Sequence, residues 1–177
     1  MQKIIALAGS NSRTSINKQL IDHTAARISD ASVDTYDLND FPMPIFGVDY
    51  EEEHGHPAQA IRFFALLQEA DGIIISLAEH NGSYSAAFKN LFDWISRMAK
   101  DCWLYKPMLL MATSPGGRGG ASVLAAASDR FPRQGGNIVA TYSLPSFDDT
   151  FRNGRIVDVA LDQQLDQRIR AFIAAIR

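Results

Sequence analysis

Three short and almost wholly apolar runs constrain the fold of this chain more than any other feature. They are residues 3–8, 72–77 and 107–113, and each is followed by a loop rich in glycine, serine or asparagine. A continuous apolar run of this length is typical of a strand buried on both faces, and such strands occur in parallel sheets. We therefore predict a parallel sheet with helices covering both of its faces.

Segments with helical spacing of apolar residues alternate with the strands. The predicted strands are residues 3–8, 33–36, 72–77, 107–113 and 137–141, and the helices lie at about 16–28, 58–70, 88–98, 121–130 and 161–176. Alternation of this kind, with right-handed crossovers, leaves few topologies. We predict a flavodoxin-like three-layer sandwich with a five-stranded parallel sheet in the order 2-1-3-4-5, formed by residues 1–177 as a single domain.

Three local expectations accompany this fold. Residues 37–57, which hold three prolines and an acidic run, are expected to be irregular. The polar segment 147–154 is either a contact loop for a partner or a cover for the site. The helix over 58–70 is expected to turn four residues towards the sheet, namely Ile61, Phe64, Leu67 and Ala70.

Composition narrows the possible partners and the compartment. The net charge of -3 gives no general attraction to nucleic acid or to anionic membranes. A single cysteine, Cys102, excludes an intrachain disulfide and fits a reducing compartment. The first apolar run is shorter than a signal-peptide core, and no stretch approaches the roughly 20 apolar residues of a membrane span. We expect a cytoplasmic protein without nucleic-acid or membrane partners.

Three predicted loops carry unusual chemistry at one edge of the sheet. They comprise residues 9–17, 78–83 and 114–120, and they leave the carboxyl ends of the first, third and fourth strands. In the order 2-1-3-4-5 these strands are adjacent, and ligands of open parallel sheets bind beyond the carboxyl ends of the strands. The three loops are therefore expected to converge on one site.

The first loop is predicted to bind a phosphate monoester. Its donors are hydroxyls, an amide, a guanidinium and the free N–H groups of a helix N-terminus, supplied by Ser10, Ser12, Arg13, Thr14, Ser15, Ile16 and Asn17. A dianion needs many donors, and a helix N-terminus favours negative charge. The loop lacks the fingerprints of nucleoside-triphosphate and dinucleotide sites. The alternative is an ordinary hydroxyl-rich turn with Ser15 as the N-cap.

The second and third loops could hold a flat ring. Asn81-Gly82 is a strong turn signal with positive φ, and a peptide N–H of such a turn could meet a ring nitrogen of a flavin. The third loop has four glycines around Arg118, which leaves backbone donors free for the carbonyl edge of a ring or for a second nucleotide. The alternatives are a solvated turn residue at His80 and a flexible strand-to-helix turn.

These motifs resemble the NADPH-dependent FMN reductase family, a flavodoxin-like group that includes azo-dye, quinone and chromate reductases. The family pattern Gly-Ser-x-Arg-x-x-Ser-x-Asn is matched at Gly9, Ser10, Ser15 and Asn17, whereas Ser12 stands at the arginine position and Arg13 one residue later. The pattern Pro-Glu-Tyr-Asn-Gly-Ser, followed by Leu-Lys-Asn and Asp-Trp, is matched at Glu79, Asn81, Gly82, Ser83, Lys89, Asn90, Asp93 and Trp94. Ala78, His80 and Phe88 depart from it. The resemblance spans roughly residues 3–140.

The resemblance implies bound FMN and hydride transfer from NADPH or NADH to a flavin, quinone, azo compound or similar small acceptor. It places the FMN phosphate on Ser10, Ser12, Arg13, Ser15 and Asn17, the ring along His80, Asn81 and Gly82, and the pyrimidine edge at Pro115, Gly116, Gly117, Arg118 and Gly119. Ile16, Glu79, Ser83 and Ser114 complete the expected cofactor site. No catalytic side chain is expected, because the flavin carries the redox chemistry. A homodimer or homotetramer is implied, with the helix after the second loop at the interface.

Two other functions stay open on the sequence. One is an electron carrier or regulatory module that binds flavin without substrate turnover, although dedicated carriers are usually strongly acidic and this chain is not. The other is a nucleotide-binding fold without flavin.

Several residues outside the loops have ordinary explanations. His54 and His56 lie beside an acidic run, but two histidines without a second cluster more often mark a solvated loop, so we expect no metal. Lys89 and Asp93 suit an i,i+4 ion pair. Phe88, Trp94 and Cys102 are expected to pack, whereas His80 or Tyr84 could line an acceptor pocket.

Overall fold

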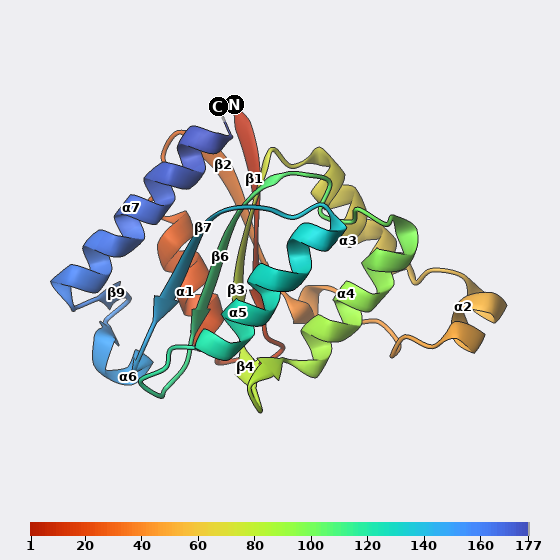
Figure 1. Cartoon of the computed structure of the whole chain (residues 1–177), viewed down its shortest axis with the longest axis horizontal. Coiled ribbons are helices and arrows are strands. Elements are labelled where there is room, and N and C mark those ends of the chain that lie inside the picture. The colour runs from red at the N-terminus through yellow and green to blue at the C-terminus, as the bar shows by residue number, and fades with distance from the viewer. Residues whose placement is uncertain (177) are drawn as a thin grey trace.

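The computed structural model describes residues 1–176, which form a five-stranded parallel sheet between two layers of helices (Figure 1). The strands of this sheet are β1 (Gln2–Gly9), β2 (Ala31–Asp37), β3 (Gly72–Leu77), β6 (Pro107–Thr113) and β7 (Asn137–Leu144). Their spatial order is β2-β1-β3-β6-β7, and all four neighbouring pairs are parallel. Numbered along the chain this order is 2-1-3-4-5, which confirms the predicted flavodoxin-like fold.

Helices cover both faces of the sheet, one layer on each (Figure 1). The first layer is α1 (Ile16–Ala25) with α7 (Val159–Ala175), and the second is α3 (Ala58–Glu69), α4 (Ala86–Met98) and α5 (Ala121–Arg130). The short elements are α2 (Val48–His54), α6 (Phe147–Thr150), the hairpins β4 (Glu79–His80)–β5 (Ser83–Tyr84) and β8 (Phe151–Arg152)–β9 (Arg155–Ile156), and 3₁₀ turns at Leu38–Asp40 and Phe131–Gln134. No helix within residues 1–176 has the length and apolarity needed to cross a membrane.

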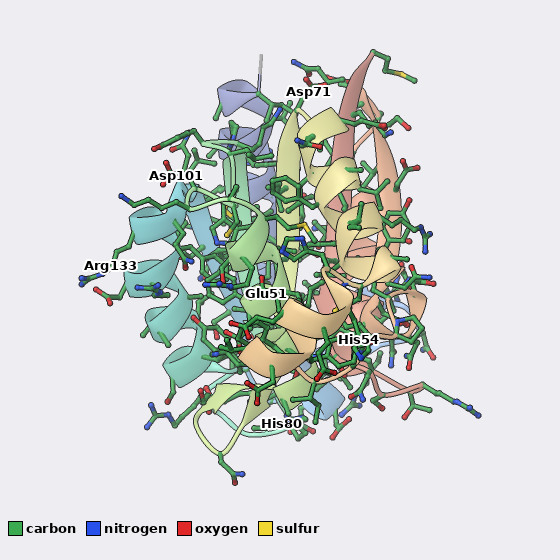
Figure 2. All side chains as sticks on the ribbon, turned by 90° about the vertical axis from the view of Figure 1, so that its right-hand side faces the viewer. Glu51, His54, Asp71, His80, Asp101 and Arg133 are labelled. Carbon is green, nitrogen blue, oxygen red and sulfur yellow. The ribbon has the colours of Figure 1, made fainter. Side chains whose placement is uncertain are left out.

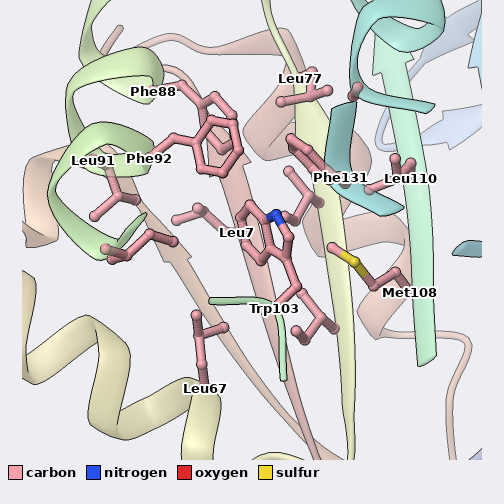
Figure 3. Close-up of a cluster of buried hydrophobic side chains, with 14 of the residues drawn as sticks. Leu7, Leu67, Leu77, Phe88, Leu91, Phe92, Trp103, Met108, Leu110 and Phe131 are labelled. Atoms are coloured by element: carbon pink, nitrogen blue, oxygen red, sulfur yellow. The ribbon is translucent and has the colours of Figure 1, made fainter. Parts of the chain in front are cut away.

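The core has two parts because successive strand residues face opposite sides of the sheet. The part under α3, α4 and α5 is rich in aromatic rings (Figure 3), with the centroids of Trp103 and Phe131 4.5 Å apart. Phe88, Trp94 and Cys102 are fully buried, as expected. Burial raises the pKa of the Cys102 thiol to about 12, and its side chain packs within this core.

Residues 37–57 are more regular than expected. Asp37 begins a 3₁₀ turn, because its carboxylate accepts from Asn39 N at 2.7 Å, and α2 follows. The segment projects from the body of the protein (Figure 1) and is tied to α4, where Trp94 Nε1 donates to Pro44 O at 2.8 Å. An ion pair of 2.9 Å between Glu51 on α2 and Arg97 on α4 adds a second link.

The buried face of α3 also differs from the expectation. Ala60, Phe63 and Leu67 are buried, whereas Ile61 is 53% exposed and wrongly assigned to the sheet-facing side. The four expected residues are spaced three apart, whereas an α-helix has 3.6 residues per turn. Each successive residue is therefore rotated further around the helix axis, and the four do not share one face. Leu67 and Ala70 are buried and were correctly assigned, and Phe64 is partly buried against the same cluster.

Candidate functional site

The three loops converge at the carboxyl edge of the sheet, as the strand order predicts. They enclose a cavity of ≈ 340 Å³ lined by Ser10, Ser12, Thr14, Ser15, Ile16, Asn17, Ala78, Glu79, His80, Thr113, Ser114 and Pro115. This volume lies within the range of roughly 300–1,000 Å³ that is typical of ligand sites. Figure 2 shows His80 at this end of the molecule, whereas Asp71, which precedes β3, lies at the opposite end.

The first loop is organised by its own serine side chains. Ser10 Oγ accepts from Ser12 N at 3.2 Å. Ser15 Oγ accepts from Lys18 N at 3.1 Å, so Ser15 is the N-cap of α1, as predicted. Both hydroxyls use an acceptor lone pair in these bonds. Their protons are therefore still available to donate to an anion in the cavity.

The N-terminus of α1 adds backbone donors and a partial positive charge. In the described part of the chain, the N–H groups of Ile16 and Asn17 have no hydrogen-bond acceptor. Arg13 is exposed and makes no ion pair or hydrogen bond with residues 1–176. An anion placed here would meet backbone N–H groups and hydroxyls, and the exposed Arg13, which does not itself line the cavity, lies in the same loop.

The side chain of Asn17 is oriented towards the sheet. It is 3% exposed, and its Oδ1 accepts from Ser76 Oγ at 2.7 Å and from Thr113 N at 3.2 Å. Its Nδ2 donates to Thr113 O at 3.4 Å. The sequence suggested a phosphate contact for this residue, and the partners found for its amide are protein groups far away in the chain.

The second loop is a tight hairpin, and the turn with positive φ expected at Asn81-Gly82 is confirmed. β4 and β5 pair with Glu79 opposite Tyr84, and Asn81 and Gly82 form the two-residue turn. Their φ values of 52° and 74° are both positive, which is the geometry that an Asn-Gly turn favours. The turn and Ser83 are exposed, and a Cβ at Gly82 would meet no atom within 4 Å. The backbone of this turn is therefore accessible to a flat ligand.

Two side chains link the second loop to its neighbours. Glu79 Oε2 accepts from Val123 N at 2.9 Å, in the first turn of α5, whose N-cap residue Gly120 has no side chain. Ser85 Oγ donates to Gly9 O at 2.9 Å and accepts from Phe88 N at 3.1 Å. The sequence placed Glu79 in the cofactor site. In the structure this carboxylate lines the cavity and also caps α5.

Tyr84 lies away from this cavity. Its ring stacks on Phe131 with an interplanar angle of 7°, and it lines a separate hollow between α4 and α5. Burial raises the pKa of the Tyr84 phenol to about 12. The structure thus places Tyr84 beside the second loop, and of the two candidates for an acceptor pocket only His80 lines the cavity.

The third loop is held by the segment that follows β7. Gly116 O accepts from Ser146 N at 3.0 Å, and Ser114 O accepts from Phe147 N at 3.1 Å. The segment 147–154, left open on the sequence, forms α6 and part of the β8–β9 hairpin. Its first helical residue thus supports the third loop. A polar stretch after the last strand was the only sequence signal for this role.

Glycine is required at two positions of the third loop. Gly120 has a φ of +76°, and a Cβ there would lie 2.7 Å from Ala112 Cβ. Gly119 has a φ of +57°, and a Cβ there would lie 2.3 Å from Ser143 Oγ. Ser143 Oγ itself donates to Gly119 O at 2.9 Å. Gly116 and Gly117 have open space around them, and Arg118 Nη2 donates to Ser122 Oγ at 3.0 Å on α5. The open part of the loop is therefore at residues 116–117.

The other sequence candidates have local partners. Lys89 and Asp93 form the expected i,i+4 ion pair at 2.5 Å. His56 Nε2 lies 3.2 Å from Glu51 Oε1, and His54 Nε2 lies 3.6 Å from Glu53 Oε2, both around α2. Across residues 1–176, no three His, Cys, Asp or Glu side chains gather in a way that could hold a metal ion.

The fold and the cavity define a flavodoxin-like α/β protein with a loop rich in hydrogen-bond donors at the carboxyl edge of its sheet. The model of the family described as NADPH-dependent FMN reductase matches residues 2–148. The chain therefore belongs to the NADPH-dependent FMN reductase family, as its loop motifs predicted.

Two relatives agree with this assignment, and a solved structure shares the fold. A quinone reductase of Escherichia coli (strain K12) is 31% identical over 120 residues, which are 67% of this chain and 63% of that protein. A 2-hydroxy-1,4-benzoquinone reductase of Burkholderia sp is 36% identical over 122 residues, 67% of this chain and 64% of that protein. The chain thus matches less than two thirds of the length of these relatives. The flavoenzyme FerB, an NAD(P)H:(acceptor) oxidoreductase of Paracoccus denitrificans, shares the fold, with a TM-score of 0.79 at 21% identity over 99% of this chain and 97% of that chain.

Proposed function

We propose that this protein is an NAD(P)H-dependent FMN oxidoreductase. It takes hydride from NADPH or NADH and passes it through bound FMN to a small acceptor such as a flavin, a quinone or an azo compound. The observation that carries the proposal is the donor-rich cavity in which α1 presents free N–H groups beside four hydroxyls. Membership of the family supports FMN as the cofactor, and the names of two relatives support quinones among the acceptors.

The donors in the first loop fit a phosphate monoester. The N–H groups of Ile16 and Asn17 and the hydroxyls of the loop serines would hold its oxygens. Arg13 does not line the cavity, but it is exposed in the same loop and would balance part of the charge. Glu79 is the one carboxylate among the residues that line the cavity, and its Oε2 is turned to Val123 N. Repulsion of a dianion by this group is therefore limited.

The second and third loops fit the ring of the same cofactor. The exposed hairpin turn at Asn81 and Gly82 and the open backbone at residues 116–117 leave peptide groups accessible to a flat molecule. When bound, FMN supplies the hydride chemistry, and the chain binds the cofactor and orients its ring. We assign no side chain as a nucleophile or general base.

We further propose that the protein works in the cytoplasm as a homodimer or homotetramer, with no nucleic-acid or membrane partner. The net charge of -3 and the single, buried cysteine support this setting. The resemblance to the family supports self-association through α4. Size-exclusion chromatography with light scattering tests it, and a monomeric mass would contradict it.

A turnover assay tests the proposed activity. Purified protein is incubated with FMN, NADPH and benzoquinone, and NADPH oxidation is followed with protein or FMN omitted as controls. We expect saturable turnover that requires both protein and FMN. FMN binding without NADPH oxidation would favour the carrier or regulatory alternative, and failure to bind FMN would contradict the assignment of all three loops.

A further inference from the structure

The last residue of β6, Thr113, has no backbone partner on β3. Leu77, the last residue of β3, pairs with Ala112, so the buried Thr113 extends one residue beyond its neighbour. Buried backbone N–H and C=O groups require partners. Asn17 supplies both, because its Oδ1 accepts from Thr113 N and its Nδ2 donates to Thr113 O. A side-chain amide thus continues the ladder where the backbone of β3 has turned away.

A third hydrogen bond links the same amide to β3. Ser76 Oγ, which is fully buried, donates to Asn17 Oδ1 at 2.7 Å. The Thr113 N–H needs an acceptor and its carbonyl needs a donor, so the orientation of the Asn17 amide is fixed. One residue in the first turn of α1 therefore contacts β3 and β6 at the point where the proposed phosphate site lies.

We propose that Asn17 is a positioning residue for the FMN phosphate: its side chain fixes the N-terminus of α1 on the sheet, and its phosphate contact is made by the backbone N–H. Leu20 and Ile21 also hold α1 on the sheet, but apolar packing is not directional. The three hydrogen bonds are directional, so they fix where the N–H groups of Ile16 and Asn17 point. This role rests on the proposed FMN site.

The test is a double-mutant cycle on FMN binding, read by quenching of FMN fluorescence. Ser76 does not line the cavity, and its hydroxyl donates to Asn17 Oδ1, so we expect Ser76→Ala to act on FMN binding through Asn17. We expect Ser76→Ala to raise the Kd for FMN about tenfold, and Asn17→Ala to raise it further, because a buried hydrogen bond is lost in each. In the Asn17→Ala background, Ser76→Ala should change the Kd by less than about twofold, because both act on one network.

A matched variant separates positioning from general loss of stability. Thr24 lies on the same helix, and its buried hydroxyl donates to Leu20 O at 2.8 Å, away from the site. Thr24→Val should lower the melting temperature without changing the Kd for FMN. Amide hydrogen exchange gives a second readout, because Thr113 N–H should be protected in the native protein and exchange faster in Asn17→Ala.

Two results would overturn the positioning role. The first is an unchanged Kd for FMN in Ser76→Ala together with a large loss of FMN affinity in Asn17→Ala. That pair of results would make the Asn17 amide a direct phosphate ligand. The second is unchanged protection of Thr113 N–H in Asn17→Ala. Failure of the proposed function is distinguishable, because the wild-type protein would then bind FMN no more tightly than riboflavin, which lacks the phosphate.

Discussion

Replacing Glu79 by alanine removes the carboxylate that caps the first turn of α5. Its Oε2 accepts from Val123 N at 2.9 Å, and Gly120, the N-cap residue of α5, offers no side chain in its place. Loss of a side-chain cap costs about 0.5–2 kcal/mol, and loss of a negative charge at a helix N-terminus costs about 0.3–1 kcal/mol. We therefore expect Glu79→Ala to lower the free energy of unfolding by about 1–2 kcal/mol.

Glutamine at position 79 is the matched variant. Glutamine retains an acceptor for Val123 N and loses only the charge, so Glu79→Gln should lower the free energy of unfolding by about 0.5 kcal/mol. Urea unfolding of the FMN-free protein measures both values, and a loss of 1–2 kcal/mol corresponds to about 3–6 °C in melting temperature for a chain of this size. A Glu79→Ala variant as stable as the wild type, yet unable to bind FMN, would refute the capping role and make Glu79 a direct ligand.

Three further perturbations, the first with Gly154→Ala as its matched control, test other parts of the site and the fold. Gly119→Ala should weaken FMN binding in calorimetric titrations at least about tenfold, because its Cβ would lie 2.3 Å from Ser143 Oγ. Gly154 also has a positive φ, but a Cβ there would meet no atom within 4 Å. Gly154→Ala should therefore lower the free energy of unfolding by only about 1 kcal/mol, the cost of a positive φ for a residue with a side chain. Gly82→Val should weaken FMN binding through the backbone, because a β-branched residue resists a φ of +74°, and normal affinity would count against the hairpin as the ring platform. Burial lowers the pKa of His23, so its contribution to stability is present above pH 6.5 and is lost as the pH falls through the lowered pKa. His23→Gln should flatten this pH dependence when the free energy of unfolding is measured against pH. A variant with the same slope as the wild type would contradict this role of His23.

The sequence predicted the sheet well because its strands are continuous apolar runs. The bounds of β3 and β6 agree with the predicted strands, and the strand order followed from the alternation with helices. α2 was missed because none of its residues is buried, so it has no apolar face for a periodicity to detect. The error at Ile61 has a related cause, since the choice between two neighbouring helix faces depends on tertiary packing.

The convergence of the three loops was predictable from the strand order, whereas the roles of single side chains were not. Asn17 and Glu79 looked like cofactor ligands in the sequence, and their partners Thr113 and Val123 follow 96 and 44 residues later. A hydrogen bond over such a separation leaves no local pattern. The individual FMN contacts at Ser10, Ser12, Arg13 and the other loop residues stay predictions.

The central claim is that this protein binds FMN at the three loops and reduces it with NAD(P)H. The most direct measurement is a visible absorption spectrum of the FMN-loaded protein, freed of unbound flavin by gel filtration and recorded before and after anaerobic addition of NADPH. We expect the flavin bands to elute with the protein and to bleach when NADPH is added. A colourless protein after gel filtration, or bound flavin that keeps its colour with NADPH, would contradict the claim.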